Sequence, residues 1–158
     1  MKQMYRHTIP GGWIQLVEHD LTPCCDDDTY PECSPTRQYV TTLVDALEAG
    51  GKNIHVAENL KKYAENAGFI NVSEVKMKLP SSHWPKDPHM KDLGKWMTLI
   101  TESGLEAYAL AAMTRATDAK SRDEIRKLVD GVKEDQRRMK THLYQYQYVH
   151  PLTDSTSC

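Results

Sequence analysis

The stretch PGGWIQLVEHD, residues 10–20, places a strand signal very close to the start of the sequence. Its Pro-Gly-Gly triplet favours a turn, and the apolar run in residues 13–18 predicts a buried strand. Only residues 1–9 precede the turn in this sequence, and residues 1–7 of them predict a short helix. The neighbours that would bury this strand must therefore come from elsewhere.

Helix signals follow at four places. Ser34 is placed to cap a helix that continues to Gly50, and Gly68 is placed to end a helix over residues 56–67. A third helix is expected over about residues 90–117. Ser121 and Glu124 form a capping-box pattern at the start of a fourth, which reaches about Lys140.

Two later segments alternate apolar and polar residues, which is typical of strands. They are residues 70–79 and residues 142–150, and Pro151 is expected to bound the second. Strands and helix pairs therefore alternate along the chain. This order predicts an open α/β sheet with helical crossovers in one domain, residues 1–158, with a frayed tail over 153–158.

Composition narrows the class of protein. The chain has 158 residues, 39% of them hydrophobic, with 20 basic and 22 acidic side chains. This balance favours neither a nucleic acid nor an anionic membrane as partner. No leader and no apolar run of membrane-spanning length is recognisable, so a soluble cytoplasmic protein is expected. The four cysteines, at 24, 25, 33 and 158, predict reduced thiols rather than a disulfide framework.

Four segments together resemble the LaeA-like fungal methyltransferases, which are class I S-adenosylmethionine-dependent enzymes often associated with secondary metabolism. The segments are PGGWIQLVEHD (10–20), LKKYAENAGFINVSEVKMKLPSSHWPKD (60–87), LGKWMTLITESGLEAYALAAMTR (93–115) and HLYQYQYVHP (142–151). The resemblance runs from about Ile9 to Pro151 and is to the C-terminal half of that family.

The resemblance implies a partial class I methyltransferase fold, which is Rossmann-like. The complete sheet of that family has strand order 3-2-1-4-5-7-6, with the seventh strand antiparallel. Residues 13–17, 70–79 and 143–149 would be its fifth, sixth and seventh strands. The three strands should therefore lie in the order 5-7-6, with helices covering them.

The resemblance also implies S-adenosylmethionine as cofactor, held by a glycine-rich loop after the first strand and an acidic residue after the second. Neither segment is present in this sequence, because Gly11 and Gly12 precede a strand and Gly50 and Gly51 follow a helix. No cofactor-binding residue can be assigned. This chain alone is not expected to bind S-adenosylmethionine.

The absence of the family's first four strands also has a consequence for the partners of this chain. Without the preceding strands of the family, the outer edge of the strand over residues 13–18 has unpaired backbone groups. A homodimer, a complex with another chain, or residues 1–7 folded over the edge would cover it, and self-association is favoured. A poorly soluble gene product and a misdrawn gene boundary are the alternatives.

Candidate catalytic residues follow the first strand, where open α/β folds place their ligands. His19 is a candidate general base, with Glu18 or Asp20 to orient it. A solvated histidine at the start of a loop is the alternative. Cys24, Cys25, residues 26–28 and Cys33 lack a second pair of ligands, so no metal site is expected.

Five residues are candidates for a substrate pocket that would bind a small-molecule metabolite: Trp84, Met97, Tyr108, Met113 and Arg115. Trp84 would pack a proline-rich connector or line the pocket, and the long helix would supply the apolar side chains. Arg115 would hold a carboxylate or pair with Asp118. The tyrosines at 144, 146 and 148 share one strand face and are expected in the core, with their hydroxyls hydrogen-bonded.

These observations predict a truncated methyltransferase-like protein of secondary metabolite biosynthesis that lacks the S-adenosylmethionine-binding half. Two alternatives stay open. The chain would be a cofactor-independent isomerase, cyclase or dehydratase built on the remaining pocket, or a non-catalytic partner subunit of a full-length methyltransferase.

Overall fold

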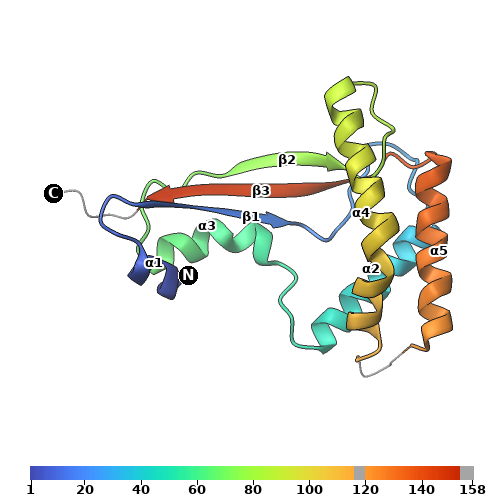
Figure 1. Cartoon of the computed structure of the whole chain (residues 1–158), viewed down its shortest axis with the longest axis horizontal. Helices are drawn as coiled ribbons and strands as arrows, with labels where there is room; N and C mark the ends of the chain where they lie inside the picture. The colour runs from blue at the N-terminus through green and yellow to red at the C-terminus, as the bar shows by residue number, and fades with distance from the viewer. Residues whose placement is uncertain (116–119, 154–158) are drawn as a thin grey trace. The chain divides into compact units, whose positions relative to one another are not determined.

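A computed structural model describes residues 1–115 and 120–153, and Figure 1 shows its helices and strands. Their order is the predicted one, a strand, two helices, a strand, two helices and a strand, after a short N-terminal helix. The elements are α1 (Lys2–His7), β1 (Trp13–His19), α2 (Pro35–Ala49), α3 (Val56–Ala67), β2 (Val75–Pro80), α4 (Pro88–Met113), α5 (Arg122–Arg138) and β3 (Tyr144–Thr153).

The three strands form one sheet in the order β1-β3-β2, which confirms the predicted order 5-7-6. β3 runs antiparallel to β1, with Trp13 opposite Thr153 and His19 opposite Gln147. The arrows in Figure 1 show β3 running opposite to both of its neighbours. The last strand of the chain therefore lies in the middle of the sheet.

Local capping chemistry fixes the helix ends. The Ser34 hydroxyl accepts a hydrogen bond from the Arg37 backbone N–H at 3.1 Å, and Gly68 ends α3 with φ of 111°. Ser121 and Glu124 form the predicted capping box. α4 begins earlier than predicted because Asp87 caps it. Its predicted end at Thr117, like Asp118, lies outside the described residues.

Two strand boundaries were predicted wrongly. β2 begins at Val75 rather than at residue 70, because Asn71 has φ of 52° and breaks the extended run. β3 continues through Pro151 to Thr153, so the predicted boundary at Pro151 is wrong. Residues 154–158 of the predicted frayed tail lie outside the described residues. The Pro151 carbonyl accepts from the Ser73 N–H at 3.2 Å. Ser73 precedes β2, so Pro151 lies beyond the part of β3 that pairs with β2. The missing N–H of Pro151 therefore removes no hydrogen bond between β3 and β2.

The prediction that β1 is buried holds for one face at most. Ile14 and Leu16 are half-buried and pack against the cluster that holds Phe69 and Leu152. Trp13 and Val17 point to the other face and are 68% and 51% exposed. The helix that contacts β1 is α3, and it covers a single face of the strand.

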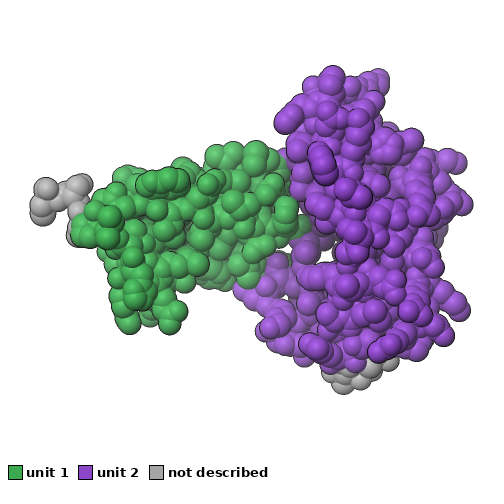
Figure 2. All heavy atoms as spheres, in the orientation of Figure 1, with its two compact units in different colours: residues 1–20, 55–77, 146–158 green, residues 21–54, 78–145 purple. Residues whose placement is uncertain are grey.

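The described residues group into two compact units, which Figure 2 colours separately. The described part of unit 1 comprises residues 1–20, 55–77 and 146–153, and its core is the cluster of Ala64, Phe69 and Leu152. Unit 2 comprises residues 21–54 and 78–145, where α2, α4 and α5 pack around Met113, Ile125 and Val129. The prediction of a single domain stays a prediction.

Candidate functional site

The predicted catalytic residues lie at the end of β1, in unit 1. Glu18 and His19 are exposed, and Glu18 Oε1 accepts a hydrogen bond from the His19 backbone N–H at 3.0 Å. Asp20 is half-buried, and its backbone N–H donates to the Tyr146 carbonyl at 2.8 Å. These bonds hold the backbone of the segment, and the role of His19 as a base stays a prediction.

The five predicted pocket residues lie in unit 2 and have different environments. Trp84 Nε1 donates to the Leu143 carbonyl at 2.9 Å, as expected for a side chain that packs the connector. Met97 lines a cavity. Met113 is 1% exposed in the helical core, whereas Tyr108 and Arg115 are exposed. Core burial therefore accounts for Met113, and Met97 is the member that the cavity supports.

Sequence reasoning missed a polar cluster in unit 2 that is centred on Asp27. One carboxylate oxygen, Oδ2, lies 2.6 Å from His142 Nδ1. The other, Oδ1, accepts hydrogen bonds from the Thr29 hydroxyl at 2.5 Å and the Cys25 thiol at 3.1 Å. We call Cys25, Asp27, Thr29 and His142 the Asp27 cluster.

These bonds lower the pKa of Asp27, with the Thr29 hydroxyl as the largest cause, followed by His142 and Cys25. Asp27 is therefore ionised at neutral pH and accepts from the His142 Nδ1–H. This leaves Nε2 as the basic nitrogen of the neutral imidazole. The Trp84 ring lies 4.9 Å from the His142 ring, centroid to centroid, so the imidazole is held on two sides. A carboxylate-oriented histidine is suited to general acid–base chemistry.

A second carboxylate, that of Asp26, stabilises the loop that contains Asp27. Asp26 pairs with Lys78 and accepts a hydrogen bond from the Tyr144 hydroxyl at 2.6 Å. Both interactions lower the pKa of Asp26, Lys78 most strongly. The Lys78 ammonium also lies 4.2 Å from the centroid of the Tyr144 ring. Tyr144 and Tyr148 are buried, as predicted for the tyrosine face of β3, whereas Tyr146 on the same face is half-buried.

We expect acid to weaken the fold through Asp27. Because its folded pKa is lowered, its stabilising contribution is present above the unfolded value of about 4 and is lost as pH falls toward the folded value. Asp27→Asn should lower the urea midpoint at pH 7 and flatten the loss of stability below about pH 4. Urea unfolding from pH 7 to pH 2.5 measures this. The matched control is Asp28→Asn, at an exposed neighbour, and an equal response from both variants would contradict the assignment.

The described residues provide neither a metal site nor a helix able to cross a membrane. Within residues 1–115 and 120–153, no group of three or more His, Cys, Asp or Glu side chains is arranged to hold a metal ion. None of the helices in those ranges has the length and apolar character needed to span a bilayer.

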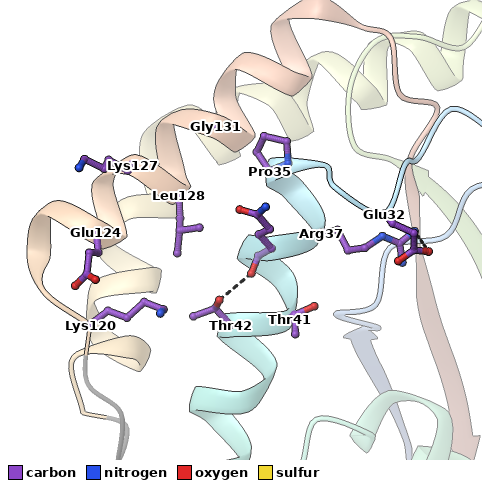
Figure 3. A pocket seen from close by; sticks show the side chains of 11 residues that line it. Glu32, Pro35, Arg37, Thr41, Thr42, Lys120, Glu124, Lys127, Leu128 and Gly131 are labelled. Atoms are coloured by element: carbon purple, nitrogen blue, oxygen red, sulfur yellow. Dashed lines mark hydrogen bonds and ion pairs between the residues drawn. The ribbon is translucent and has the colours of Figure 1, made fainter.

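Two hollows in the described part of unit 2 are candidates for a binding site. The larger, about 720 Å³, is an open groove between α2 and α5, and Figure 3 shows the side chains that line it. Charged side chains of both signs surround it, including Arg37, Lys127 and Glu124. The smaller is a cavity of about 110 Å³ among α2, α4, α5 and the start of β3, and Tyr39, Met97 and Gln136 line it.

The strand order, the antiparallel last strand and the helical connections define the class. The chain has an α/β fold with the strand arrangement of a partial class I methyltransferase.

Comparisons with known proteins identify the family. The chain is 35% identical over 144 residues to "Secondary metabolism regulator LAE1" of Cochliobolus heterostrophus, covering 90% of this chain and 47% of that protein. It is 30% identical over 142 residues to "Methyltransferase pytC" of Aspergillus terreus, covering 90% and 44%. Over these residues the chain belongs to the LaeA-like family of fungal methyltransferases, and it spans just under half the length of these relatives.

Two further comparisons were made. No family model matches the chain. Among solved structures, the phosphoethanolamine N-methyltransferase 2 of Haemonchus contortus aligns with 98% of this chain and 29% of its own, at 15% identity and a TM-score of 0.42.

Proposed function

We propose that this chain is a methyltransferase-like protein of fungal secondary metabolism. It would form the part of the methyltransferase fold that binds the substrate. The observation that carries the proposal is the 35% identity to a secondary metabolism regulator over nine-tenths of the chain, combined with the β1-β3-β2 sheet. In this proposal a small-molecule metabolite is the substrate, and His19, oriented by Glu18 or Asp20, is a candidate base for its hydroxyl or carboxyl group.

The described residues do not fit S-adenosylmethionine. Class I enzymes bind it at a glycine-rich turn that leads from a strand into a helix. The glycines with positive φ here are Gly11, Gly51 and Gly68, which respectively precede β1, follow α2 and end α3. None of these three lies between a strand and the helix after it, so we derive no step through the cofactor.

We therefore expect this chain to show no stoichiometric binding of S-adenosylmethionine or S-adenosylhomocysteine. Isothermal titration calorimetry of the chain with each compound measures this. A complete class I methyltransferase, titrated under the same conditions, is the positive control. Saturable one-to-one binding by this chain would contradict the proposal that the donor site is missing, and it would also argue against cofactor-independent chemistry.

A second candidate function is favoured by the Asp27 cluster. His142 Nδ1 lies 2.6 Å from the Asp27 carboxylate, and a histidine oriented in this way is suited to acid–base chemistry that needs no cofactor. Isomerisation, cyclisation and dehydration of a pathway intermediate all need such a proton carrier. This candidate differs from the first in its base, which is His142 in unit 2 rather than His19 in unit 1.

We also propose that the chain self-associates through the free edge of β1. In the described residues β1 pairs with β3 alone, and Trp13 and Val17 are exposed beside the unpaired edge. Light scattering coupled to size exclusion should give a mass that rises with protein concentration. Val17→Lys should shift the mass to that of the monomer, whereas Met4→Lys, at an exposed residue of α1, should not. A monomer at every concentration would contradict this proposal.

A further inference from the structure

The outer edge of β1 carries backbone groups that no strand among the described residues pairs with. β1 lies at one edge of the sheet (Figure 1), and its neighbour is β3. The Asp20 N–H donates to the Tyr146 carbonyl of β3 at 2.8 Å. The N–H and C=O of a strand residue point to one side, and this side alternates along the strand. The even-numbered residues of β1 therefore face β3, and the backbone groups of Trp13, Gln15 and Val17 face outward.

Two local features limit this open edge. At its C-terminal end, Glu18 Oε1 accepts a hydrogen bond from the His19 backbone N–H at 3.0 Å, so this outward N–H already has a partner. At its N-terminal end, Gly11 has φ of 74°, which interrupts the extended conformation that strand pairing needs. The open edge therefore runs over residues 13–17, and its midpoint is Gln15.

Residues 13–17 match a second copy of themselves when the two run antiparallel and meet at Gln15. Trp13 then lies opposite Val17 of the second copy on one face, and Ile14 lies opposite Leu16 on the other. Pairs of an aromatic with a β-branched side chain stabilise neighbouring strands. Trp13 and Val17 are 68% and 51% exposed, so both have surface to bury in such a pair. None of residues 13–17 is charged, so two copies do not repel each other there.

We propose that two copies of this chain pair through β1, antiparallel, about a two-fold axis at Gln15, so that their sheets become one continuous sheet. This inference rests on the self-association proposed above and adds its register. A two-fold axis brings the same patch of both copies together, as an antiparallel pair of identical strands requires. Every outward N–H and C=O of Trp13, Gln15 and Val17 then has a backbone partner in the second copy.

The neighbouring register fits less well. An axis at Leu16 would need the His19 N–H, which the Glu18 carboxylate already binds. It would also place Glu18 opposite Ile14 of the second copy, a charged side chain against an aliphatic one. An axis at Gln15 requires neither. A pairing of this length buries little surface, so we expect a weak dimer whose population depends on protein concentration.

Gln15 is the residue that faces its own copy in this register, so charges introduced there test it. Gln15→Glu and Gln15→Lys, each alone, place like charges opposite each other. Each should raise the dissociation constant of the dimer at least about three-fold. An equimolar mixture places opposite charges together and should associate at least as tightly as the unaltered chain. Sedimentation equilibrium of each variant and of the mixture measures this.

Gln3 provides the matched control, because it is an exposed glutamine of α1 in the same unit. Gln3→Glu, Gln3→Lys and their mixture should all associate as the unaltered chain does. If the Gln15 mixture associates no more tightly than its components, the register is wrong. Continued association of the unaltered chain would then leave the wider self-association proposal standing, whereas a monomer at every concentration would overturn both.

Amide hydrogen exchange tests the same register without any substitution. The N–H groups of Trp13, Gln15 and Val17 gain partners in the dimer, so their exchange should slow as protein concentration is raised. The His19 N–H keeps its bond to Glu18 and should change little. Slowing at His19 that equals the slowing at Gln15 would indicate the axis at Leu16 and would contradict the proposal.

Discussion

Gly94→Ala should destabilise the chain by about 3 kcal/mol or more, which is a large part of the stability of a typical domain. Gly94 lies buried in α4, where the connector after β2 crosses the helix. A Cβ atom built there would lie 2.1 Å from the Ser82 carbonyl oxygen and 2.9 Å from the His83 nitrogen. Both contacts are with backbone, so a change of side-chain rotamer cannot relieve them. Urea unfolding measures the loss.

The same helix provides the control. Gly104 also lies within α4, but a Cβ atom there would meet nothing within 4 Å. Gly104→Ala should therefore stabilise the chain by about 0.5–1 kcal/mol through helix propensity. If Gly94→Ala lowers the free energy of unfolding and Gly104→Ala raises it, contact with backbone atoms is the cause of the loss at Gly94. Equal stability of Gly94→Ala and the unaltered chain would contradict the path of the connector.

Met113→Ala should cost about 2–5 kcal/mol of unfolding free energy, because it removes most of a side chain that is 1% exposed and leaves a void. Met113 packs in the helical core with Tyr39, Ala109 and Ile125. Met113→Leu keeps nearly the same volume and should cost less than about 1.5 kcal/mol. Thermal and urea unfolding of both variants measure the difference.

The variant Tyr108→Ala is the comparison for Met113→Ala. It tests whether residues predicted to line the pocket also stabilise the core. Tyr108 was predicted to line the pocket together with Met113, but it is exposed on α4. Its truncation should change stability by no more than about 0.5 kcal/mol, as is usual for surface sites. If Met113→Ala and Tyr108→Ala had equal and small effects on unfolding, the core assignment of Met113 would be wrong.

The parts of the fold that could be predicted from the sequence are those with local causes. Ser34, Gly68 and Ser121 fix helix ends through contacts within four residues, and all three caps were predicted. The strand order came from the family resemblance, because periodicity alone does not say which strands are neighbours. The start of β2 was missed because residue 71 adopts a left-handed conformation that alternation of polarity does not register.

The Asp27 cluster could not be predicted for the opposite reason, since its contacts are distant in sequence. Asp27 and His142 are 115 positions apart. The available signals were an acidic run at 26–28 and a histidine just before the last strand, and neither alone indicates a pair. The smaller cavity of unit 2 is similar, because the residues that line it come from α2, α4, α5 and the start of β3. Tertiary topology creates both sites.

The position of β3 between β1 and β2 has a consequence for the order in which the chain folds during synthesis. β1 is made long before residues 147–153, with which it pairs. Until then β1 has no strand partner from the described residues, while the helices of unit 2 already have one another. Contacts of such long sequence separation form slowly. The pairing of β1 with β3 is therefore expected to form after the helical core of unit 2 has been made.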